Sequence, residues 1–127
     1  MINFGWGDYD RTYGVVEFNG DWTTENLVTS VSTIYNELKN ANQPINLMID
    51  LRHSAVPPTS VMGVASRIVT GRSTFPIGRV IVITKTFLWK RLYDAMSQTR
   101  LGFSIDIHFV EDIDTAYQLL LTADNAS

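Results

Sequence analysis

The chain has 127 residues, of which 45% are hydrophobic and 18% are charged. This length and balance are typical of one globular domain and exclude a disordered chain, so we expect a single domain over residues 1–127. The net charge of −3, with ten Lys and Arg residues, argues against nucleic-acid binding, because phosphate contacts require a basic face. There is no cysteine, which excludes disulfides, thiolate metal sites and thiol nucleophiles.

The first residues of the sequence lead us to expect no secretion signal. Residues 1–8 lack a basic segment followed by an apolar one. The apolar runs, such as Val80–Ile83, are far shorter than the roughly 18 to 20 residues that cross a bilayer. We therefore expect a cytoplasmic protein with no membrane span.

The first part of the chain reads as a hairpin followed by a helix. Aromatic and β-branched runs at Ile2–Trp6 and Tyr13–Phe18 flank a turn-forming segment at 7–11, which predicts a β-hairpin. Thr23 or Thr24 can cap a helix whose apolar residues recur at spacings of three and four, so that one face is buried. These apolar residues are Leu27, Val28, Val31, Ile34, Tyr35 and Leu38.

Two buried strands and a helix are predicted in the middle of the chain. Ile45–Leu51 is nearly continuous apolar sequence, which is typical of a central strand covered on both faces. A second helix is expected over 61–69, where Thr59 or Ser60 can serve as its N-cap. Arg79–Thr84 reads as the next buried strand.

The last part of the chain predicts a helix, a strand and a final helix. The third helix is expected from Phe87 to about Leu101. Apolar and polar residues then alternate over 105–109, which predicts a strand with one wetter face at an edge of the sheet. A helix that begins near Asp112 has an apolar stripe formed by Ile113, Ala116, Tyr117, Leu120 and Leu121.

This order of elements predicts an α/β fold. Strands that alternate with helices indicate right-handed crossovers, and the initial hairpin adds an antiparallel strand. We expect a mixed, mostly parallel five-stranded sheet with about four helices. The hairpin and the strand near 105–110 would be its edges, through which a second copy could pair to form a homodimer.

Ligands of parallel sheets bind outside the carboxyl ends of the strands. This rule points to six residues that follow two neighbouring strands: Arg52, His53, Ser54, Thr84, Lys85 and Thr86. Their cations, imidazole and hydroxyls would suit a phosphate, a carboxylate or an acidic protein surface. The alternative is that they are solvated loop residues without a ligand. The nearby basic cluster of Lys85, Lys90 and Arg91 is interpreted as a solvated helix surface.

The sequence contains no catalytic signature. His53 and Ser54 are neighbours, but the Gly-x-Ser-x-Gly elbow of a serine hydrolase is absent. His53 and His108 lack the spacing of a metal site. We therefore expect a non-enzymatic protein without metal or cofactor. A hydrolase built on Ser54 and His53 is ranked third, after the two functions that are described next.

The order of elements and the segments Phe18–Glu25 and Leu47–Arg52 resemble the SpoIIAA-like proteins of the STAS superfamily. The resemblance implies a regulatory or ligand-binding module that acts through a protein partner. STAS antagonists of anti-sigma factors carry a phosphorylatable serine in an Asp-Ser-Ser-Gly motif, which here falls on residues 58–61 and places Thr59 at the acceptor position. Because two of the four residues depart from the motif, helix capping by Thr59 or Ser60 is the alternative to phosphorylation.

SpoIIAA-like proteins also resemble lipid carriers of the CRAL-TRIO type. This resemblance implies a second alternative, a carrier of an apolar small molecule or lipid. Aromatic residues near the ends of the elements could line its pocket, namely Trp22, Phe75, Phe87 and Trp89. Ordinary packing in the core is the competing interpretation of these residues.

Overall fold

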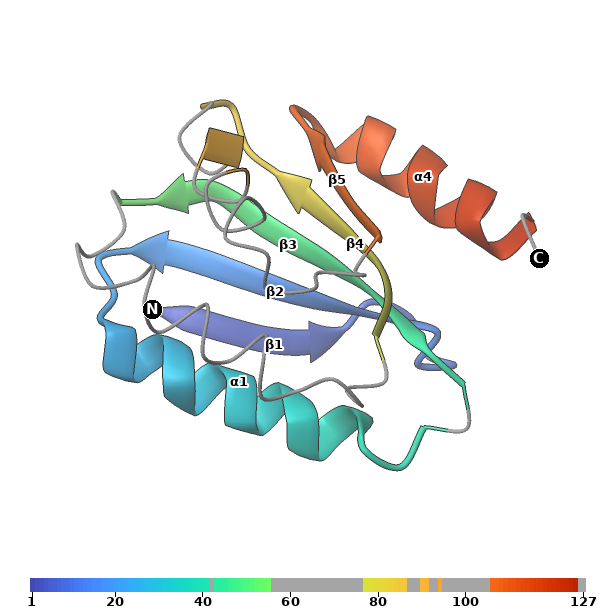
Figure 1. Ribbon diagram of the computed structural model, residues 1–127, viewed down its shortest axis with the longest axis horizontal. Coiled ribbons are helices and arrows are strands. Elements are labelled where there is room, and N and C mark those ends of the chain that lie inside the picture. The colour runs from blue at the N-terminus through green and yellow to red at the C-terminus, as the bar shows by residue number, and fades with distance from the viewer. Residues whose placement is uncertain (42, 56–76, 87–89, 92–93, 95–105, 126–127) are drawn as a thin grey trace.

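The computed structural model describes residues 1–41, 43–55, 77–86, 90–91, 94 and 106–125. Its elements are β1 (Ile2–Trp6), β2 (Tyr13–Gly20), α1 (Thr24–Leu38), β3 (Ile45–Ser54), β4 (Ile77–Ile83), β5 (Asp106–Val110) and α4 (Ile113–Asn125). The strands form one five-stranded sheet of order β1-β2-β3-β4-β5 (Figure 1). Among the described residues, no helix is long and apolar enough to cross a membrane.

The sheet is mixed, as the element order predicted. β1 pairs antiparallel with β2, whereas β2 with β3, β3 with β4, and β4 with β5 are parallel pairs. β1 and β5 are the outermost strands of the sheet, which confirms that the hairpin and the strand near 105–110 form its edges.

The described residues contain two helices rather than about four. The helix expected over 61–69 lies outside them, and so does most of the helix expected over 87–101, of which Lys90, Arg91 and Asp94 are helical. α4 begins directly after Asp112, as predicted. The Asp112 side chain accepts a hydrogen bond of 2.7 Å from the Thr115 N–H, and this bond lowers the pKa of Asp112.

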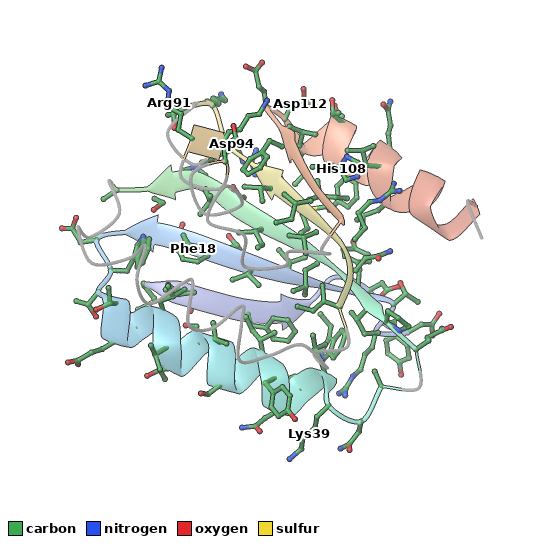
Figure 2. The ribbon with its side chains drawn as sticks, in the orientation of Figure 1. Phe18, Lys39, Arg91, Asp94, His108 and Asp112 are labelled. Atoms are coloured by element: carbon green, nitrogen blue, oxygen red, sulfur yellow. The ribbon has the colours of Figure 1, made fainter. Side chains whose placement is uncertain are left out.

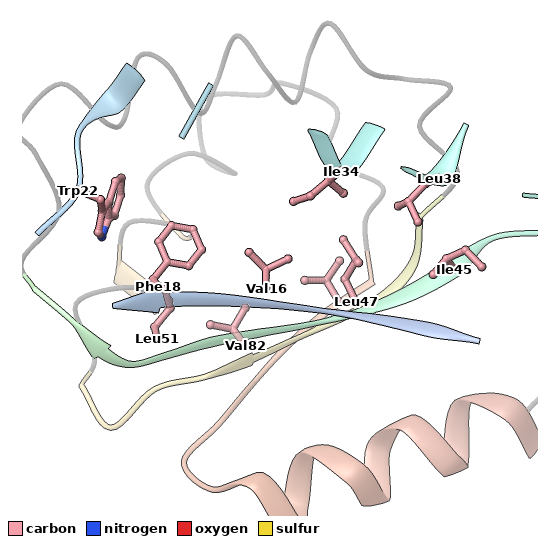
Figure 3. Close-up of a cluster of buried hydrophobic side chains, with 10 residues drawn as sticks. Val16, Phe18, Trp22, Ile34, Leu38, Ile45, Leu47, Leu51 and Val82 are labelled. Atoms are coloured by element: carbon pink, nitrogen blue, oxygen red, sulfur yellow. The ribbon is translucent and has the colours of Figure 1, made fainter. Parts of the chain in front are cut away.

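One hydrophobic core lies between the sheet and α1 (Figure 3). Alternate residues of the strands point to this face because the side chains of a strand alternate between its two sides. The cluster consists of Val16, Phe18, Trp22, Ile34, Leu38, Ile45, Leu47, Leu51, Val80 and Val82. Trp22 is thus a core residue, and its ring packs edge-on against Phe18 at 5.1 Å between centroids. The other aromatic residues considered for a lipid pocket, Phe75, Phe87 and Trp89, lie outside the described residues.

A second core lies on the opposite face, where α4 covers the sheet. Its buried residues are Met48, Ile81, Ile83, Ala116 and Leu120. The predicted stripe of α4 is wrong at two positions, since Tyr117 and Leu121 are 43% and 64% exposed. A helix that lies on a sheet buries only a limited arc of its surface, and these two residues lie on the flank of that arc.

Thr23 caps α1, as predicted. Its hydroxyl accepts a hydrogen bond of 3.0 Å from the Asn26 N–H, and the Asn26 side chain accepts one of 2.9 Å from the Thr23 N–H. This reciprocal capping box satisfies two backbone donors that the helix itself leaves without partners.

Replacing Thr23 with alanine should lower the free energy of unfolding by about 0.5–2 kcal/mol, because the Asn26 N–H then loses its acceptor. Urea denaturation followed by circular dichroism would measure this loss. Thr33→Ala, at an exposed position inside the helix, is the control and should cost less. Equal stability of Thr23→Ala and the wild type would contradict the capping role.

Candidate functional site

The parallel strands β2 to β5 end at the same edge of the sheet, as the rule for ligand sites requires. The structure divides the six predicted site residues between two places along this edge. Arg52, His53 and Ser54 lie at the end of β3, and the segment 84–86 follows β4.

The first group belongs to a strand and not to a loop. β3 extends to Ser54, three residues beyond its expected end, because His53 pairs with Asn19 and Ser54 with Gly20 of β2. The Ala55 N–H extends this pairing with a hydrogen bond of 2.9 Å to the Gly20 carbonyl. This part of the predicted loop is therefore held by the sheet.

Arg52 binds a carboxylate of the protein itself. Its Nη2 and Nε donate hydrogen bonds of 2.8 and 3.0 Å to the two oxygens of Asp50, and its backbone N–H donates another of 3.0 Å. Asp50 is only 7% exposed. The hydrogen bonds from Arg52 lower the pKa of Asp50, and the same contact raises the pKa of Arg52. The guanidinium is thus largely engaged before any external anion arrives.

The spacing of Asp50 and Arg52 in the sequence already indicates that they can pair, although Arg52 was predicted to bind an external anion. Residues two apart in a strand lie on the same face, so that an acidic residue at a buried position can reach a cation two residues later. Asp50 and Arg52 have this spacing.

The Ser54 hydroxyl is engaged in the structure. It accepts a hydrogen bond of 2.8 Å from the Trp22 indole N–H and donates one of 2.9 Å to the Ala55 carbonyl. His53 is exposed next to it. A serine hydrolase needs its hydroxyl hydrogen-bonded to the base, and here the proton goes to a backbone carbonyl instead.

A cavity of about 200 Å³ lies beyond the ends of β4 and β5. Its walls are formed by Thr84, Lys85, Thr86, Lys90, Phe109, Val110 and Glu111. Three of these residues were predicted site residues. Lys90 and Glu111 were missed, because Lys90 was read as part of a solvated helix surface and Glu111 follows a different strand. Among the described residues that line it, Lys85 and Lys90 are cationic and Glu111 is anionic, so these residues together carry one net positive charge.

Thr84 brings a buried hydroxyl to this cavity. The residue is 6% exposed, and its backbone N–H donates to the Val110 carbonyl at 2.9 Å, which fixes it against β5. Its Oγ1 accepts a hydrogen bond from the Thr86 N–H at 3.3 Å. The hydroxyl lies 3.5 Å from the Thr86 carbonyl, whereas O–H···O hydrogen bonds usually measure about 2.5–3.0 Å. The hydrogen bond from the Thr84 hydroxyl to the Thr86 carbonyl is therefore a weak one.

The proposed phosphoacceptors, Thr59 and Ser60, lie outside the described residues, and their phosphorylation stays a prediction. Within the part of the chain that the structure describes, no three His, Asp or Glu side chains gather as metal ligands would.

A scan against models of protein families finds no match for this chain, and a search of curated proteins finds none either. The architecture, a mixed five-stranded sheet with α1 and α4 on opposite faces, defines the protein as an α/β sandwich. Among solved structures it is similar to an uncharacterised protein of the DUF3478 family from Shewanella loihica PV-4, which has a SpoIIAA-like fold. The TM-score is 0.67 at 17% sequence identity, over 94% of this chain and 92% of that one. The chain therefore has a SpoIIAA-like fold, as the resemblance in its sequence implied.

Proposed function

We propose that this protein is a non-enzymatic, STAS-like regulatory module that binds a small anion, or an anionic group of a protein partner, in the cavity beyond β4 and β5. The absence of cysteine supports a cytoplasmic setting. The SpoIIAA-like fold supports a STAS-like module, and the charged and hydroxyl groups of the cavity support an anionic ligand.

The observation that carries this proposal is the pairing of two lysines with a buried hydroxyl. Lys85 and Lys90, which both follow β4 closely in the chain, line the cavity, and Thr84 adds a buried hydroxyl whose hydrogen bond to the Thr86 carbonyl is long. Charged donors form the stronger hydrogen bonds to phosphate or carboxylate oxygens. A recess also raises the attraction, because it contains less water than an open surface.

The size of the cavity favours a small anion over a lipid. Pockets that bury an organic ligand typically measure roughly 300–1,000 Å³, and this one measures about 200 Å³. Phosphate or carboxylate head groups fit such a space. The apolar walls, Phe109 and Val110, would limit access of water to the anion.

Titration calorimetry with inorganic phosphate and with acetate tests the proposal. Lys85→Glu and Lys90→Glu should each lower the affinity about tenfold or more, because each turns an attractive charge into a repulsive one at close range. Lys39→Glu is the matched control. Lys39 is exposed at the C-cap of α1, and Figure 2 shows it at the far end of the molecule from Arg91 and Asp112.

Unchanged affinity in both cavity variants, or an equal loss in Lys39→Glu, would contradict an anion site in this cavity. Native mass spectrometry and an activity assay on the same sample address the two alternatives, the lipid carrier and the hydrolase. An extractable apolar molecule would favour the carrier. Turnover of p-nitrophenyl acetate or p-nitrophenyl phosphate that Ser54→Ala or His53→Ala abolishes would favour the hydrolase.

A further inference from the structure

α4 covers one side of its sheet face and leaves the hairpin side uncovered among the described residues. The helix packs on β4 and β5, whereas β1 and β2 contribute exposed or half-buried side chains to the same face. In the register of the strands, Gly5 lies beside Val15, and Glu17 lies beside Asp50. A Cβ added at Gly5 would meet no atom within 4 Å, so the described residues leave the space directly above Gly5 open. We define the open strip as Gly5, Tyr13, Val15, Glu17, Tyr117 and Leu121.

The flank of α4 beside this surface is apolar. The ring of Tyr117 stands edge-on to Tyr13, with 6.4 Å between the ring centroids. Leu121 follows one turn later on the same flank. Together with the half-buried Val15, these side chains form an apolar surface that runs along the side of α4 facing the hairpin.

The open strip contains the carboxylate of Glu17 and is bordered by those of Asp114 and Asp8. Glu17 is exposed on the sheet, and Asp114 is exposed one turn before Tyr117 on α4. Asp8, in the hairpin turn, lies close enough to Tyr13 to raise the pKa of that phenol, after the larger effects of burial and of Tyr117. Two cations near the open strip already have partners: Arg52, whose pKa is raised mainly by its hydrogen bonds to Asp50 and less strongly by the charge of Glu17, and Arg11, which lies 5.6 Å from the ring centroid of Trp6.

We propose that the open strip docks a basic amphipathic helix of a partner protein. The apolar face of that helix would cover Val15, Tyr117 and Leu121, and Lys or Arg residues on its flanks would face Glu17, Asp114 and Asp8. A helix fits because it would lie beside α4, at the spacing of roughly 8–10 Å that neighbouring helices adopt, and complete the layer. A second copy of this chain fits less well, since it would bring the same carboxylates to the interface.

The probe is a synthetic peptide of about 14 residues, made of Leu and Lys in an amphipathic helical pattern, and the readout is titration calorimetry with the full chain. Leu121→Lys should weaken binding about tenfold, because it removes one leucine contact and adds a like charge. Glu17→Gln should weaken binding less, and the difference should vanish in high salt because the attraction is then screened. Val28→Lys is the control, since Val28 is 46% exposed on α1, on the other side of the sheet.

A Leu/Glu peptide of the same pattern should bind at least tenfold more weakly than the Leu/Lys peptide. Equal affinities for the two peptides, or unchanged binding in Leu121→Lys, would overturn the proposal. A dimer in sedimentation velocity that Leu121→Lys dissociates would also overturn it in favour of a second copy. The proposal is independent of the anion cavity, so Lys85→Gln should leave peptide affinity unchanged.

Discussion

Replacing Ile81 with alanine should lower the free energy of unfolding by about 2–5 kcal/mol. Ile81 is 0% exposed in β4 and packs in the core that α4 covers. The substitution removes buried apolar surface and leaves a cavity that the neighbouring strand and helix can fill only in part. Urea denaturation followed by tryptophan fluorescence and circular dichroism would give this value, provided that both signals change together.

Val28→Ala is the matched control for this prediction. Val28 is also a β-branched residue, but it is 46% exposed on α1, so its truncation should change stability by no more than about 0.5 kcal/mol. If Ile81→Ala were as mild as Val28→Ala, the packing of α4 against this face of the sheet would be wrong.

Asp50→Asn should cost about 1.5–3 kcal/mol at neutral pH, since hydrogen bonds to a charged group are among the stronger ones in proteins. The substitution keeps the shape of the side chain and removes the charge that holds Arg52 at 2.8 Å. Because Asp50 is a buried polar residue, water cannot fully replace the lost contact.

The pH dependence of stability separates this contact from others. The hydrogen bonds from Arg52 lower the pKa of Asp50 below its ordinary value of 3.8. The carboxylate therefore stabilises the fold fully above the pKa of the unfolded chain, and this contribution is lost as the pH falls through the lower pKa of the folded state. Between pH 5 and 3 the wild type should thus lose more stability than Asp50→Asn.

The control for Asp50→Asn is Asp10→Asn, in the exposed hairpin turn, which should change stability by less than about 0.5 kcal/mol. Parallel losses of stability in the wild type and Asp50→Asn between pH 5 and 3 would show that the pair with Arg52 is not the source of the pH dependence.

Local patterns predicted most of the described elements. The strand over Ile2–Trp6 has the expected bounds, and Thr23 caps α1 through a reciprocal capping box. These features depend on residues close together in the chain, where alternation, helical spacing and capping act directly. The resemblance to SpoIIAA-like proteins rested on the same local order of elements and agrees with the fold.

The candidate site was predicted only in part, because its members are joined by contacts between distant segments. Thr84, Lys85 and Thr86 line the cavity as their position after β4 indicated, but Glu111 reaches it from the end of β5. Arg52 was expected to face a ligand and is held by Asp50. Residue type and distance from a strand end do not reveal which carboxylate a cation will meet.

The amino-acid sequence by itself determined the α/β class, the β1–β2 hairpin, the buried strands and the capped start of α1, since each follows from short-range periodicity and backbone preferences. Only the tertiary structure decided that β3 continues to Ser54, because that depends on pairing with β2. It also decided which flank of α4 stays exposed and which lysines share a cavity. These features depend on how the strands and helices pack, and packing is determined by the whole chain and not by any one segment.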